Sequence, residues 1–174
     1  MDTRQVIGLI EAAFPLLPLP EMTLHQARLA DQSMSREIPD REWNDAGKID
    51  AGRTWRDFTD EDLKACDVAL AHFDEPSFIY HLPAFLLFAV RYCTVEWPHP
   101  AEHLVGTVVF SVTHRSPYTL GRYKRLSAEQ RMAVIAFLEL IAAEGNHNER
   151  PLAQKALARY WKTDEGTKPI IVVP

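Results

Sequence analysis

The stretch "FIYHLPAFLLFAVRYC", from Phe78 to Cys93, constrains the fold more than any other part of the sequence. Arg91 is the first charged residue after Pro83, and every face of a helix built here would be apolar. Such a helix is normally surrounded by the rest of the protein. Because proline is tolerated in a first helical turn, we expect the helix to begin at Pro83 and to run to about Tyr92. A membrane span needs about 20 apolar residues, roughly twice this run.

Several other segments carry helix signals. Asp2, Thr59 and Ser127 are each followed three residues later by a side chain that can complete a capping box. Residues 101–114 are rich in valine, but their polar residues recur every four positions, which indicates a helix. With 174 residues, of which 47% are apolar, the chain can bury one sizeable core. We predict a mainly α protein, a single compact multi-helix domain over residues 1–174 with a fully buried central helix.

Charge is unevenly distributed along the chain. Residues 31–62 hold ten acidic and five basic residues, a balance of −5 that equals the net charge of the whole chain. Pro39, Gly47 and Gly52 interrupt this region, so we predict an acidic surface loop over residues 31–58. Clustered carboxylates steer basic partners, and tryptophan is a common interface anchor. The alternative is that the tryptophans fix the loop to its own core. The predicted protein-binding residues are Asp40, Glu42, Trp43, Asp45, Asp50 and Trp55.

The sequence "HPAEH" is the pattern closest to a catalytic motif. His99, Glu102 and His103 match H-x-x-E-H, in which two histidines and a distant acid bind zinc and the glutamate activates water. Both histidines must project from one helix face, yet Pro100 in a first turn would leave His99 outside the helix. We therefore favour no metal and no cofactor, and keep a zinc-dependent hydrolase as the alternative. Whether the protein is an enzyme stays open, with the sequence favouring a non-enzyme.

Tyr80 and His81 directly precede the expected start of the apolar helix. At a helix N-terminus they could line a pocket for an anion. The alternative is that they form hydrogen bonds across a loop.

A basic segment follows residues 101–114. Arg115, Arg122, Lys124, Arg125 and Arg131 are interleaved with tyrosines, a composition that can bind single-stranded nucleic acid. We expect "SPYTLGRYKR" to be a loop. Nucleic-acid binding is a second alternative, made less favourable by the net charge of −5.

The two ends of the chain and its cysteines carry weaker signals. Asp2 offsets Arg4 and Glu11 interrupts the first apolar run, so we see no signal peptide and expect a cytoplasmic protein without membrane contact. Cys66 and Cys93 lie in apolar helical patterns, and we expect two buried thiols. The tail, residues 164–174, contains "IIVVP" and must dock on the body, pair with a hidden strand edge or bind another molecule.

The segments "AFPLLPLP", "FIYHLPAFLL" and "LSAEQRMAVIAFLEL", with the pair Trp55 and Phe58, occur in an order and spacing that resemble a bacterial family of unknown function. The resemblance covers Phe14 to Leu140 and includes a Tyr-x-Leu-Pro-Ala core helix and a Leu-Ser-x-Glu-Gln helix. Where that family has a second aromatic residue, this chain has His81. The resemblance implies a small bacterial cytoplasmic protein with no assigned activity or catalytic residues.

Small proteins of this kind are similar to the immunity partners of secreted toxins. Together with the acidic segment, it favours a protein-binding module of immunity or regulatory type. Its partner would be a basic protein, for example a toxin.

Overall fold

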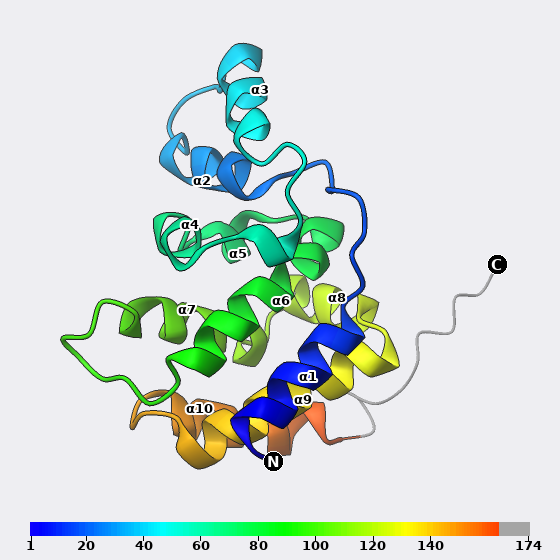
Figure 1. The fold of residues 1–174 in the computed structure, drawn as a ribbon, viewed down its shortest axis with the longest axis vertical. Coiled ribbons are helices and arrows are strands. Elements are labelled where there is room, and N and C mark those ends of the chain that lie inside the picture. The colour runs from blue at the N-terminus through cyan, green and yellow to red at the C-terminus, as the bar shows by residue number, and fades with distance from the viewer. Residues whose placement is uncertain (164–174) are drawn as a thin grey trace. The chain divides into compact units, whose positions relative to one another are not determined.

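The structure is a computed structural model that describes residues 1–163 (Figure 1). Every regular element in this range is a helix, so the predicted mainly α class is confirmed. The predicted tail, residues 164–174, lies outside the described residues. The elements are α1 (Thr3–Ala13), α2 (Leu24–Gln32), α3 (Asp40–Ile49), η1 (Trp55–Asp57), α4 (Asp60–Ala65), α5 (Ala69–His72), α6 (Glu75–Arg91), α7 (Glu102–Thr113), α8 (Pro117–Arg125), α9 (Ala128–Glu144), α10 (Glu149–Ala156) and η2 (Leu157–Trp161).

The chain divides into two compact units. Unit 1 consists of Met1–Pro15 and the described residues from Leu86 onward, and unit 2 consists of Leu16–Phe85. Helix α6 contributes residues to both. No helix among residues 1–163 is long and apolar enough to cross a bilayer.

Unit 1 is built around α9, which lies beside α1 and α10, while α10 also packs on α7 (Figure 1). The side chain of Ser127 accepts a hydrogen bond from the N–H of Gln130 and Gly145 follows the last turn, as predicted. Two polar side chains tie the helices together from inside the core. Nε1 of Trp161 donates to the carbonyl of Val112 at 2.8 Å, and the buried hydroxyl of Tyr123 lies 2.8 Å from the carbonyl of Ser111.

In unit 2, α2 packs against α3 and α5. Thr23 caps α2 through a capping box with Gln26. The amide of Gln26 then reaches α3, where Nε2 donates to the carbonyl of Trp43 at 3.1 Å. The predicted cap at Thr59 is present, but the helix that it starts is interrupted after Ala65 and resumes as α5.

The start of the apolar helix was predicted wrongly. Helix α6 begins at Glu75, and Pro83 lies inside it. The side chain of Asp74 accepts a hydrogen bond from the N–H of Ser77 at 2.8 Å, so Asp74 caps the helix. Inside the helix Pro83 has no N–H to donate to the carbonyl four residues earlier. The predicted burial on all faces is confirmed by the fully buried side chains Phe85, Leu86, Phe88, Ala89 and Val90.

Two predicted loops are partly or wholly helical. Residues 31–58 include α3 and η1, because the charged residues of α3 pair along the helix: Lys48 lies 2.8 Å from Asp45, three residues away. Of the residues expected to interrupt this region, Pro39 precedes α3, Gly47 lies inside it, and Gly52 follows it with a φ of 76°. "SPYTLGRYKR" forms α8, with Ser116 as the cap and Pro117 at the first helical position.

Candidate functional site

Helix α3 of unit 2 presents three exposed carboxylates, Asp40, Glu42 and Asp45, which we call the α3 acidic face. No residue of α3 is buried. Two of the carboxylates pair with exposed cations, Glu42 with Arg36 at 2.6 Å and Asp45 with Lys48 at 2.8 Å. Exposed pairs of this kind contribute about 0–1 kcal/mol each, so the cations of a partner could replace them at little cost.

Trp43 belongs to the same helix and is half-buried. Its backbone carbonyl is held by Gln26 of α2. A partly exposed tryptophan on a helix that also carries exposed carboxylates is of the residue type common among interface anchors.

The other two predicted protein-binding residues lie inside the unit, which corrects the prediction. Asp50 is 0% exposed and Trp55 is 2% exposed. The carboxylate of Asp50 accepts hydrogen bonds from His25, and Arg53 lies 3.7 Å from it. Trp55 starts η1, and the guanidinium of Arg56 lies over its ring. Both residues therefore stabilise the unit and are not accessible to a partner.

The charge of unit 2 extends beyond α3. Between residues 16 and 85 the chain has 14 acidic and 7 basic residues, a balance of −7, whereas the chain as a whole carries −5. A surface of one predominant sign attracts oppositely charged proteins and raises their association rate.

Tyr80 and His81 do not lie at a helix N-terminus, the position for which the sequence suggested an anion pocket. Both are buried within α6, five and six residues after its first residue, Glu75, and so are not at a helix entrance. The imidazole of His81 stacks on Phe73 at 4.3 Å and its Nδ1 lies 2.8 Å from the carbonyl of Ser77. Burial lowers the pKa of His81 to about 4, so the ring is neutral near pH 7.

The residues of "HPAEH" do not converge. His99 precedes α7, and its Nδ1 accepts a hydrogen bond from the N–H of Ala101 at 3.1 Å. Glu102 and His103 are the first two residues of α7. His99 therefore does not share a helix face with His103, as the position of Pro100 suggested. Among residues 1–163, no group of three or more His, Cys, Asp or Glu side chains is arranged to hold a metal ion.

The basic segment does not form a continuous basic surface. Arg122 and Arg131 are buried, and so is Tyr123, one of the tyrosines interleaved with these cations. Of the five cations that suggested nucleic-acid binding, the exposed ones are Arg115, Lys124 and Arg125.

Both cysteines are buried and free, as expected. Burial raises the pKa of Cys66 to about 12 and also raises that of Cys93. A thiol that stays protonated near pH 7 is a poor nucleophile.

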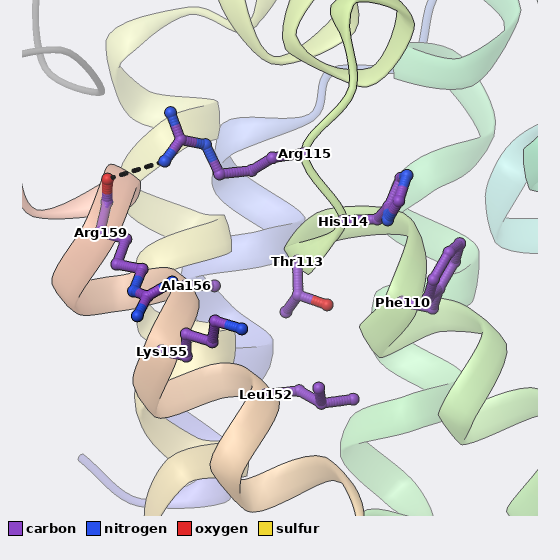
Figure 2. Close-up of a pocket in the computed structure, with 8 residues that line it drawn as sticks. All are labelled: Phe110, Thr113, His114, Arg115, Leu152, Lys155, Ala156 and Arg159. Atoms are coloured by element: carbon purple, nitrogen blue, oxygen red, sulfur yellow. Dashed lines mark hydrogen bonds between the residues drawn. The ribbon is translucent and has the colours of Figure 1, made fainter.

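The structure also contains a pocket that the sequence did not predict, in unit 1 between α7 and the α10–η2 segment (Figure 2). We call it the α7–α10 pocket. Its cavity has a volume of about 310 Å³. Phe110 and Leu152 are 55% and 42% exposed, and the ring of Phe110 stacks on that of His114 at 4.7 Å. The lining residues are Phe110, Thr113, His114, Arg115, Leu152, Lys155, Ala156 and Arg159.

Three cations surround this apolar surface: Arg115, Lys155 and Arg159. Nη1 of Arg115 donates to the backbone carbonyl of Arg159 at 3.4 Å, which joins the end of α7 to η2 (Figure 2). None of the described residues that line the pocket is acidic. Positions 152, 155, 156 and 159 have the spacing of one helix face, which the sequence alone indicates. The sequence does not indicate that this face lies opposite α7.

Comparison with known proteins relates the chain to a protein family. The model of a family described as a family of unknown function (DUF6714) matches residues 2–165, a range that includes both units. No similar protein was found among curated proteins, and none among solved structures.

Proposed function

The chain belongs to this family of unknown function, and we propose that it is a protein-binding module of immunity or regulatory type. Its binding surface is the α3 acidic face together with Trp43. Its partner is a basic protein, for example a toxin.

One observation carries the proposal: α3 holds three exposed carboxylates and a half-buried tryptophan on a helix with no buried residue. The surrounding unit carries a balance of −7 between residues 16 and 85. Carboxylates that are already exposed lose little by pairing with a partner's cations, and long-range attraction accelerates the encounter.

The alternatives lack a comparable observation. A metal-dependent hydrolase would use His99, Glu102 and His103, but His99 lies outside the helix that carries the other two. Nucleic-acid binding would use the basic segment, in which Arg122 and Arg131 are buried.

The test is a differential capture followed by reconstitution. Proteins bound by the wild type from a lysate of the encoding organism are compared with those bound by D40K/E42K/D45K. The control variant E21K/E96K/E144K makes the same change of net charge at exposed carboxylates outside α3. The proposal predicts a basic protein that the wild type and the control bind and that the α3 variant loses. If the α3 variant and the control capture the same proteins, the proposal is wrong.

A further inference from the structure

We propose that the α7–α10 pocket is a second binding site, which takes an acidic peptide segment that carries one large apolar side chain. This inference concerns unit 1 and does not depend on the function proposed for α3, whose partner has the opposite charge.

The positive charge of the pocket favours a negatively charged ligand. Lys155 extends from α10 toward the space between α10 and α7 (Figure 2), and Arg159, one turn further along, also lines the pocket. Arg115 adds a third cation at the end of α7. No acidic side chain is among the described lining residues, so the charges that these residues offer a bound carboxylate are attractive.

The apolar surface of the pocket selects an apolar group. Phe110 comes from α7 and Leu152 from α10, so each wall of the cavity contributes an apolar side chain (Figure 2), and the buried Ala156 also lines it. Exposed aromatic and aliphatic side chains of this kind gain stability when a partner covers them. A cavity of about 310 Å³ is at the lower limit of pockets that enclose a small molecule.

The position of the polar groups favours a peptide over a free small molecule. His114, Arg115, Lys155 and Arg159 are all exposed. Small-molecule sites hold their ligand through a few precisely placed polar groups inside the pocket, whereas protein interfaces have an apolar centre and a polar, solvent-accessible rim. The α7–α10 pocket has the second arrangement.

A selection from a library of short random peptides tests the inference. Peptides enriched on the wild-type protein are expected to contain an aromatic or large aliphatic residue next to Asp or Glu. Their affinity, measured by fluorescence anisotropy, should fall about tenfold or more in K155E/R159E and should decrease with salt. The matched control K124E/R125E reverses two exposed cations outside the pocket and should retain the wild-type affinity within about twofold. Circular dichroism checks that both variants are folded.

Three outcomes would overturn the inference. The first is that no peptide is enriched, and the second is that the enriched peptides bind K155E/R159E as tightly as the wild type. The third is that phenylacetate, a free small carboxylate, displaces the peptide when the two are present at equal concentrations. That result would identify the pocket as a small-molecule site. None of these outcomes involves α3, so failure here is distinguishable from failure of the proposed function.

Discussion

Asp50 accepts two hydrogen bonds from His25, one from the backbone N–H at 2.9 Å and one from the ring Nδ1 at 2.8 Å. Asp50 is the residue that ends α3, and His25 lies in the first turn of α2. The pair therefore fixes the end of α3 against the start of α2, so Asp50, which the sequence suggested as a protein-binding residue, is an internal support of unit 2.

Asp50→Asn should destabilise the protein without changing the α3 acidic face. The amide cannot accept both hydrogen bonds as well as a carboxylate does, and Arg53 loses its nearby charge. We expect a loss of about 1–3 kcal/mol in the free energy of unfolding, measured by urea denaturation. The exposed control Asp45→Asn should cost less than about 0.5 kcal/mol. Equal stability of the two variants would contradict the role assigned to Asp50.

The stability of the protein should fall as the pH falls through the range in which His81 becomes protonated. The pKa of His81 is lowered by burial from 6.5 to about 4, so the unfolded state takes up a proton before the folded state does. His81 therefore contributes stability that is complete above about pH 6.5 and is lost as the pH falls toward 4. Other groups also titrate in this range, so the measurement is the difference between the wild type and His81→Phe in urea denaturation at several pH values. The wild type should lose up to about 3 kcal/mol relative to the variant between pH 7 and 4, and parallel curves would contradict the account.

Two glycines should respond to alanine in opposite ways. A Cβ at Gly145 would lie 2.5 Å from the carbonyl oxygen of Ile141, whereas a Cβ at Gly8 would meet nothing within 4 Å. Gly8→Ala places a better helix former inside α1 and should stabilise the protein by about 0.5–1 kcal/mol. Gly145→Ala should destabilise it by about 1–3 kcal/mol, because the backbone at the end of α9 must shift. Thermal unfolding shows whether each variant is more or less stable than the wild type. Stabilisation by both substitutions would contradict the close approach of Gly145 to the carbonyl oxygen of Ile141.

Adjacent leucines of α6 should differ in their contribution. Leu86 is fully buried, while its neighbour Leu87 is half-buried. Leu86→Ala should cost about 2–5 kcal/mol of unfolding free energy because it leaves a cavity in the core. Leu87→Ala should cost clearly less. A reversed order in denaturant unfolding would refute the burial pattern of this helix.

The sequence predicted those features that depend on neighbouring residues. The caps at Asp2, Thr59 and Ser127 are present because each needs only a side chain three residues away. The buried side of residues 101–114 also follows from local spacing. By contrast, the start of α6 was missed because two prolines could each mark a helix start, and Asp74 with Pro76 was the correct signal.

The candidate sites depend on contacts between distant residues, and the sequence could not supply these. Asp50 and Asp45 are both acidic residues near Trp43, yet only Asp50 meets His25, which is 25 positions away. The α7–α10 pocket joins residues 110–115 to residues 152–159, two segments whose contact no local pattern predicts. Charge and residue type therefore predicted only some of the exposed residues of the acidic surface, and they did not predict the pocket.

The most direct test of the central claim is the affinity of the purified partner for the D40K/E42K/D45K variant. Isothermal titration calorimetry would compare it with the wild type and with E21K/E96K/E144K at two salt concentrations. The account predicts that the dissociation constant of the α3 variant rises about tenfold or more, while that of the control stays within about twofold of the wild type. Equal affinities for all three proteins would contradict the assignment of function to α3.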